Sequence, residues 1–521
     1  MISLKKPNGF FVFVLFFVLI GFGYLQTVNI LDPDFGWHIK TGELILERGV
    51  PKVDWYSYTM PDFLWVDHEW LTDVLIYKLH SVFGYQSLLL LFLSLTALAF
   101  IIFIKIEHFY IYLVPVLFGF LSVLSYLGLR PQIITAFFVA ISWKVLIDFL
   151  KKDNKGFHLF YLTPILFLIW VNLHGGFAAG IFVLSLVLAL EIFKRTIVFE
   201  RMMGLRFFQG QYSEKISTQK TILLFWILVL SFLATLINPY GIRIYEEVFR
   251  TVGDNFLRFH IAEWLPLFGT GVSALTIFYL ALTTGLLAVL RKKIELNRIT
   301  LLTVFLILSF LSQRHFLIFV ILSIPVLSEM ILILKEEIKP ERVKMLFSGF
   351  GRLAVTFFIF ALLFSGFFQN TKRLLKRENQ IDYPSDSAIA FLRSLPLSEN
   401  LFNDYGWGGY LIWKLPERKL FIDGRMPSWR QNGQFTFGDY IKITDAEDGF
   451  QGLLDKYNTK IIMLQSAEKN KEPKKEALIE NWLSRIMGYN SPGNLYEELI
   501  GSDWENVYDD GIAVILRRSK H

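Results

Sequence analysis

The chain has 521 residues, of which 54% are hydrophobic and only 19% charged, and it contains no cysteine. Soluble domains are about 25% charged, so this composition, together with recurring apolar stretches of about 20 residues, excludes a soluble fold and indicates a polytopic α-helical membrane protein. Disulfides and thiolate metal sites are excluded as well. The net charge of +6 could indicate nucleic-acid binding or membrane topology, and the positions of the basic residues decide between the two.

Eleven membrane spans are predicted from hydropathy. They lie near residues 10–30, 85–105, 109–129, 131–150, 158–174, 176–194, 220–238, 271–290, 298–312, 315–335 and 352–370. No small-residue cleavage site follows the first span, which favours an uncleaved span over a signal peptide. The even-numbered connections hold far more Lys and Arg per loop than the odd-numbered ones, so the positive-inside rule places the N-terminus in the cytoplasm and the C-terminal region on the non-cytoplasmic side. The positive charge is therefore a topology signal, and nucleic acid is not an expected partner.

Two domains are predicted. A transmembrane domain covers 1–372 and includes the first outer loop at 31–84, and an extracytoplasmic α/β domain covers 373–521. In the second domain the spans end and the charges of both signs nearly balance. Its pattern predicts helices over 385–395 and 449–457 and strands over 419–423, 460–464 and 512–516. About 140 residues are enough for a core of its own.

The first outer loop concentrates acidic and imidazole side chains, namely Asp32, Asp34, His38, Asp67, His68 and Glu69. Such groups are costly to hold beside lipid and indicate a functional site. Structural roles are the alternative, since Asp34 could cap an interfacial helix over 36–48. A second interfacial helix over 69–80 would have an apolar face made of Leu71, Val74, Leu75 and Leu79. The spacing matches no metal motif, so Asp32, Asp34 and Glu69 are candidate metal ligands by residue type only.

Further polar clusters fall on the same predicted outer face: LRPQ (129–132), NLHGG (172–176), NPYG (238–241), AEWLP (262–266) and QRH (313–315). One-sided clustering predicts a single cavity at the membrane surface, walled by several helices. Arg130 and Arg314 could simply extend to the interface, but guanidinium groups also bind phosphate oxygens bidentately. His174 and His315 are candidate donors to a sugar or phosphate, and Glu263 is a candidate cavity carboxylate.

Two motifs resemble the GT-C superfamily of membrane glycosyltransferases. DPDFGWHIKTGELILERG (32–49) is similar to the first outer loop of oligosaccharyltransferase catalytic subunits and protein mannosyltransferases, and still more similar to a group of prokaryotic membrane proteins with a DxDxxWH pattern. NDYGWGGYLIWKLPERKLFIDGR (403–425) is similar in layout to the WWDYG region of oligosaccharyltransferases, which contacts the acceptor. Phe402 and Asn403 replace its two tryptophans, so sequon binding is not implied.

The resemblance implies transfer of a sugar from a polyprenyl-phosphate donor to a protein, lipid or glycan acceptor at the outer face. Asp34, with Asp32 as the alternative, would orient and partly deprotonate the acceptor hydroxyl. Arg130, Arg314 and His315 would bind the donor phosphate, which gains negative charge as it leaves. A divalent cation, Mg²⁺ or Mn²⁺, could assist, although the later outer loops lack a second DxD. The other expected site residues are His38, Asp67, His68, Glu69, His174 and Glu263 in the cavity, and Asp404, Tyr405 and Trp407 at the acceptor.

Two other functions are compatible with the sequence. A transporter or flippase of a lipid-linked sugar could use the same polar groups, but transporters place binding groups near the bilayer midplane, where these spans carry almost no charge. A non-catalytic scaffold could bind a glycan through its outer domain. In that domain, Asp404, Tyr405, Trp407, Asp423 and Arg425 could line an acceptor groove or be core and turn residues.

Overall fold

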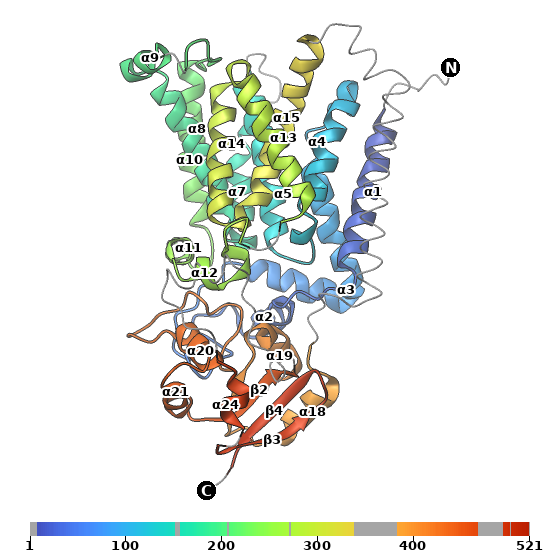
Figure 1. The fold of residues 1–521 in the computed structure, drawn as a ribbon. Coiled ribbons are helices and arrows are strands. Elements are labelled where there is room, and N and C mark those ends of the chain that lie inside the picture. Colours follow the sequence, from blue (N-terminus) through green and yellow to red (C-terminus); the bar gives the residue numbers. More distant parts are fainter. Residues whose placement is uncertain are drawn as a thin grey trace, which may run out of the picture. The chain divides into compact units, whose positions relative to one another are not determined.

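The computed structural model describes residues 8–151, 157–205, 208–269, 272–337, 383–466, 493–500 and 502–519. Its contacts divide the chain into two compact units (Figure 1). Unit 1 is Met1–Ile30 with Leu79–Gln380, and unit 2 is Leu31–Lys78 with Ile381–His521. We expected the first outer loop to belong with the spans, but most of it makes its contacts with the C-terminal region.

Unit 1 is a bundle of apolar helices. Its centre is α15 (Phe316–Glu337), which packs against α4 (Phe109–Ser122), α5 (Gln132–Leu150), α13 (Ala274–Leu290) and α14 (Leu296–Leu311) (Figure 1). Its other helices are α1 (Gly9–Thr27), α6 (Phe157–Phe160), α7 (Thr163–Leu173), α8 (Phe177–Phe193), α9 (Ile197–Met203), α10 (Thr218–Thr235), α11 (Arg243–Gly253), α12 (Leu257–His260) and the later part of α3 (Trp70–Ile101).

Six of the described helices are long and apolar enough to cross a membrane, and a seventh span results if the bent pair Phe177–Phe193 and Ile197–Met203 counts as one. Three shorter apolar helices, Ile106–Ser122, His158–Leu173 and Leu296–Leu311, also coincide with predicted spans. The chain is therefore a multi-pass membrane protein, while the count of eleven is not confirmed. The predicted span over 352–370 lies outside the described residues.

The helix α3 joins a predicted interfacial helix to a predicted span. The junction is Gly84, whose φ of 73° and ψ of 176° break the helical path. Only glycine adopts such a conformation without steric cost. The buried positions before the break are Glu69, Thr72, Asp73 and Ile76, whereas Leu75 of the predicted apolar face is exposed. Leu71, Val74 and Leu79 of that face are half-buried, and this pattern fits the predicted interfacial helix, because a helix at a lipid interface can leave apolar side chains outside the protein core.

Unit 2 is built on a four-stranded sheet in the order β1 (Asn400–Asn403), β2 (Thr459–Gln465), β4 (Ala513–Arg518), β3 (Trp504–Asp509). The β1–β2 pair is parallel and the other two pairs are antiparallel. The predicted strands over 460–464 and 512–516 are confirmed within β2 and β4. Its helices are α2 (Phe35–Arg48), α18 (Asp386–Ser394), α19 (Gly408–Lys414), α20 (Thr436–Thr444), α21 (Phe450–Lys456) and α24 (Leu495–Leu499).

Two predicted helices of unit 2 are confirmed as α18 and α21, but the predicted strand over 419–423 forms only two isolated bridges at Leu420, with Ser57 and with Leu401. The side chain of Asn403 explains the difference. Its Oδ1 accepts the backbone N–H of Phe421 at 2.9 Å, and its Nδ2 donates to the carbonyl of Ile422 at 2.8 Å. A buried amide therefore satisfies backbone groups that a neighbouring strand would otherwise pair.

Candidate functional site

The candidate catalytic carboxylate lies at the start of α2. Asp34 occupies the N-cap position, but its side chain makes no capping hydrogen bond. Its Oδ1 accepts from Trp37 Nε1 at 2.9 Å, and its own N–H donates to Asp32 Oδ1 at 3.0 Å. Asp32 and Asp34 are half-buried. The structural alternative, a capping aspartate, is therefore not realised, and the carboxylate is oriented by a tryptophan side chain instead.

Glycines bring the start of α2 into backbone contact with the C-terminal segment of the same unit. A Cβ on Gly36 would lie 2.1 Å from the carbonyl oxygen of Gly409, and a Cβ on Gly409 would lie 2.2 Å from that of Pro33. A Cβ on Gly424 would lie 1.9 Å from Asp34 Oδ1. Glycine thus occurs at the points where the stretches 403–410 and 423–425 contact the loop 32–38. The close approach of Gly424 also limits the positions that the Asp34 carboxylate can adopt.

One helical turn after Asp34, a buried polar cluster joins α2 to the start of α3. His38 Nδ1 lies 2.6 Å from Asp73 Oδ1, and His38 Nε2 lies 3.5 Å from Glu69 Oε2. His68 is partly exposed, with its Nε2 3.4 Å from Glu69 Oε1. Asp67 is buried, and burial first, then the neighbouring Asp73 carboxylate, raises the pKa of Asp67 well above its usual value. The structure thus brings four of the predicted loop residues together, with Asp73 in addition.

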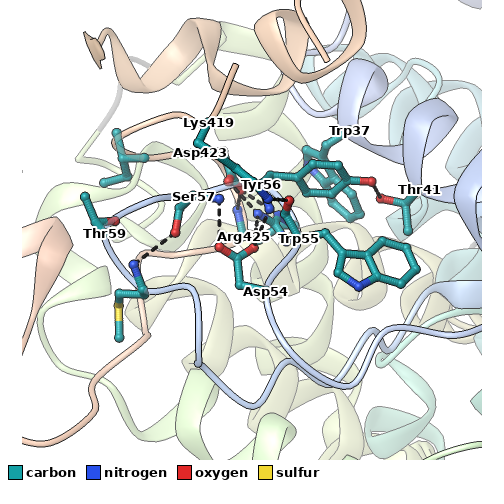
Figure 2. A network of polar contacts seen from close by, with 12 residues as sticks. Trp37, Thr41, Asp54, Trp55, Tyr56, Ser57, Thr59, Lys419, Asp423 and Arg425 are labelled. Carbon is teal, nitrogen blue, oxygen red and sulfur yellow. Dashed lines mark hydrogen bonds and ion pairs between the residues drawn. The ribbon is translucent and has the colours of Figure 1, made fainter. Parts of the chain in front are cut away.

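A caged guanidinium holds the outer loop to the C-terminal segment (Figure 2). Arg425 donates from Nε and Nη2 to Asp423 at 2.7 and 2.6 Å and from Nη2 to Asp54 at 2.8 Å. Its guanidinium carbon lies 4.3 Å from the ring centroid of Trp65 and 4.7 Å from that of Tyr56. Burial alone would lower its pKa, but the two carboxylates raise the pKa of Arg425 above its ordinary value. This residue is part of the core rather than an exposed groove.

The Asp54 carboxylate also organises its own loop. It accepts the N–H groups of Tyr56 at 3.1 Å and Ser57 at 2.8 Å, and the Tyr56 hydroxyl lies 2.9 Å from Thr41 Oγ1 on α2. Figure 2 shows these groups around the guanidinium. A single ion-pair network therefore connects three separate stretches of unit 2.

The predicted acceptor residues have different environments. Trp407 is fully buried and belongs to the core. Asp404 accepts from Gln465 Nε2 at 3.2 Å, and the N–H of Tyr405 donates to the Tyr440 hydroxyl at 3.0 Å. Both side chains are half-buried. Asp404 and Tyr405 thus remain partly accessible candidates, whereas Trp407 is not accessible.

In unit 1, three predicted clusters meet around the short helix η3 (Ala262–Trp264). Arg130 Nη1 lies 3.4 Å from Glu263 Oε1, and Gln132 Nε2 lies 3.5 Å from Glu263 Oε2. The Arg314 guanidinium lies 5.0 Å from the ring centroid of Trp264. The segments LRPQ, AEWLP and QRH, far apart in sequence, therefore form one polar group with two half-exposed arginines.

Of the two predicted histidines of unit 1, His315 belongs to this group, and His174 has separate partners. His315 follows Arg314 in the short helix η5 (Gln313–His315), with Nδ1 3.4 Å from the carbonyl of Ser312. His174 is buried, and its Nδ1 accepts the N–H of Gly176 at 2.9 Å and lies 2.6 Å from Thr135 Oγ1. A Cβ on Gly176 would lie 2.0 Å from that same Oγ1, so the glycine is needed for close approach. The expectation that the clusters of both units line one cavity stays a prediction.

Sequence reasoning missed two residues, Asp54 and Asp73. Asp73 follows Glu69 by four positions, a spacing that places both on one helix face toward His38. That signal was readable. Asp54 lies among aromatic residues in VDWYSY, and nothing in the sequence pairs it with an arginine 371 positions away.

The residues that could hold a metal are His38, Glu69 and Asp73. One potential ligand atom from each lies within 4.8 Å of the others, and this is the single such group within the described parts of the chain. Imidazole nitrogen and carboxylate oxygen are suitable ligands for a divalent cation. Asp32 and Asp34 are not part of that group.

The chain matches no family model and no curated protein. Among solved structures, it is similar to the archaeal oligosaccharyltransferase AglB from Archaeoglobus fulgidus in complex with an inhibitory peptide and a dolichol-phosphate. The TM-score is 0.57 at 11% identity, over 88% of this chain and 70% of that one. It is also similar to the same enzyme tethered to an acceptor peptide with the NVT sequon (TM-score 0.53, 11% identity, 88% and 70% covered). The apo form gives a TM-score of 0.53 at 12% identity, over 90% and 70% of the two chains. The chain therefore has the fold of an archaeal oligosaccharyltransferase.

Proposed function

We propose that the protein is a GT-C type glycosyltransferase that moves a sugar from a polyprenyl-phosphate donor to an acceptor at the outer face of the membrane, with Asp34 as the base. The observation that carries the proposal is Asp34 itself. It is a half-buried carboxylate oriented by Trp37 and limited in position by Gly424, in a chain with the fold of an oligosaccharyltransferase.

The proposed transfer forms one bond to the anomeric carbon and breaks another. The acceptor hydroxyl donates a hydrogen bond to the Asp34 carboxylate, its oxygen attacks the anomeric carbon, and its proton passes to Asp34. The bond from the anomeric carbon to the phosphate oxygen breaks, and the phosphate leaves with the electron pair. A phosphate leaving group needs no protonation by a carboxylic acid, unlike the alcohol leaving group in glycoside hydrolysis.

Arg130 and Arg314 are the proposed phosphate ligands. Both are half-exposed and lie around one short segment, where guanidinium groups would stabilise the charge that grows on the leaving phosphate. The neighbouring His315 is the proposed third donor. A divalent cation would neutralise phosphate charge when bound. No step of this proposal passes through the His38, Glu69 and Asp73 group.

The oligosaccharyltransferase AglB is described with a dolichol-phosphate and, in the tethered form, with a sequon peptide. We propose the same class of donor here, but a different acceptor, because Asn403 holds the 421–422 backbone with its side chain at a position where the WWDYG region has tryptophan. Asp404 and Tyr405 are the proposed acceptor contacts.

The test is to incubate the purified full chain with a panel of radiolabelled polyprenyl-phosphate sugars and native membranes as the acceptor source. We expect labelled product from at least one donor, and its loss in Asp34→Asn while donor binding is retained. Donor binding without transfer for every sugar would favour a flippase or a scaffold and would contradict the proposal.

A further inference from the structure

The buried cluster at the start of α3 has more acidic groups than the surrounding residues neutralise. His38 and Asp73 have side chains that are 3% and 0% exposed, and that of Glu69 is 7% exposed. Asp67 is buried beside them. The nearby cation Arg425 is already paired with Asp54 and Asp423. Among the described residues, three carboxylates thus stand against the buried imidazole of His38 and the partly exposed imidazole of His68.

Two carboxylate oxygens in this cluster have no donor. Asp67 Oδ2 and Asp73 Oδ2 are both buried, and no N–H or hydroxyl group of the described residues donates to either oxygen, while the two carboxyl groups lie close enough to each other to share a proton. A buried carboxylate oxygen without a donor is unfavourable unless a proton or a cation compensates it. Both atoms belong to residues that lie within or beside the one group able to ligate a metal.

We propose that His38, Glu69 and Asp73 bind a divalent cation of the Zn²⁺ or Mn²⁺ type, which ties α2 to the start of α3 behind Asp34. This site is separate from the proposed sugar transfer and stands whether or not that function is correct. The donor set of one imidazole and two carboxylates suits these two ions better than Ca²⁺ or Mg²⁺, which prefer oxygen alone.

The backbone already holds the three candidate ligand atoms at nearly the separation that a bound ion requires. Metal bonds of about 2.0–2.2 Å place neighbouring tetrahedral ligand atoms about 3.4 Å apart. The three candidate atoms lie within 4.8 Å of one another, and His38 Nε2 is 3.5 Å from Glu69 Oε2. The two helices are in close backbone contact beside the cluster, since a Cβ on Gly42, one turn after His38, would lie 2.0 Å from the Asp73 carbonyl oxygen. Side-chain adjustment on a fixed backbone is therefore enough.

The competing arrangement is a proton shared between His38 and Asp73, whose atoms are already 2.6 Å apart. A bound ion and a shared proton would have different observable consequences. An ion binds with saturable stoichiometry and brings a nitrogen into its coordination shell, whereas a shared proton does neither.

The experiment titrates the full chain in detergent, stripped with a chelator, with Mn²⁺ alone and with Zn²⁺ alone. Equilibrium dialysis gives the stoichiometry, and the Mn²⁺ spin echo gives the ligand nitrogen. We expect one saturable site per chain, nitrogen modulation that His38→Gln abolishes, and affinity lowered by at least about tenfold in Glu69→Gln. Glu47→Gln, an exposed glutamate on the same helix α2, is the matched control and should bind as the wild type does.

Three results would overturn the proposal. The first is no saturable binding to the wild-type chain, which needs no variant to fold. The second is binding that survives Glu69→Gln and Asp73→Asn together. The third is binding that Asp34→Asn abolishes while His38→Gln leaves it intact, because the ion would then lie at Asp34.

Discussion

Replacing Gly424 by Ala should lower the rate of the proposed sugar transfer by displacing Asp34, without replacing the proposed base itself. The added methyl would lie 1.9 Å from Asp34 Oδ1, whereas ordinary contact begins at 3.4 Å, so one of the two must move by about 1.5 Å. The 423–425 turn is held by the buried Asp423–Arg425 pair. The Asp34 carboxylate is therefore the group expected to move, and its hydrogen bond to Trp37 should be lost.

The expected size of the effect follows from that displacement. A shift of about 1 Å in a reacting group can cost about 10²-fold in rate, and overpacking typically costs about 1–3 kcal/mol of stability. The assay is the single-turnover transfer rate, with thermal unfolding in parallel. Gly452→Ala is the matched control, because no atom lies within 4 Å of its Cβ position and alanine favours the helix α21. A transfer rate in Gly424→Ala equal to that of the control would refute the reasoning.

Three further predictions follow from the same contacts. Arg425→Met leaves two buried carboxylates without a cation and should cost about 3–5 kcal/mol in denaturant unfolding, whereas Arg430→Met, at an exposed position, should cost little. Arg130→Ala and Arg314→Ala should each raise the KM for the phosphate donor by about tenfold, and an unchanged KM in both would exclude them as phosphate ligands. Burial alone would raise the pKa of Asp510, but hydrogen bonds from backbone N–H groups of the β3–β4 turn and from a serine hydroxyl hold it below its ordinary value. The stability it contributes is therefore present above about pH 4 and lost as the pH falls, so Asp510→Asn should destabilise the chain at about pH 7 but not at about pH 2, as measured by unfolding midpoints.

The membrane character and the interfacial helix of the first outer loop were readable from the sequence, because both depend on local composition and periodicity. The predicted helix over 36–48 corresponds to α2, and strands β2 and β4 lie where short β-branched runs predicted them. The resemblance of 32–49 and 403–425 to one family also indicated the fold. Short strands such as β1 and β3 gave little signal, since their stability comes from pairing with distant residues.

The organisation of unit 2 could not be read from local patterns. Its central contacts join Asp54 to Arg425 and Gly36 to Gly409, more than 370 positions apart in each case. A glycine in the sequence shows only that a side chain is absent, not which backbone approaches it. Asp73 is different, because its spacing of four positions from Glu69 was a local signal, but it lies on the polar face of a helix that was interpreted from its apolar face.

The central claim, that Asp34 is the base of a sugar transfer, is tested most directly by the single-turnover rate of Asp34→Asn beside Asp62→Asn, an exposed aspartate in the same loop. We predict that the first variant loses at least about 10²-fold in rate at saturating donor, as expected for loss of a positioned general base, while the second transfers at the wild-type rate. Equal rates in the two variants would contradict the account.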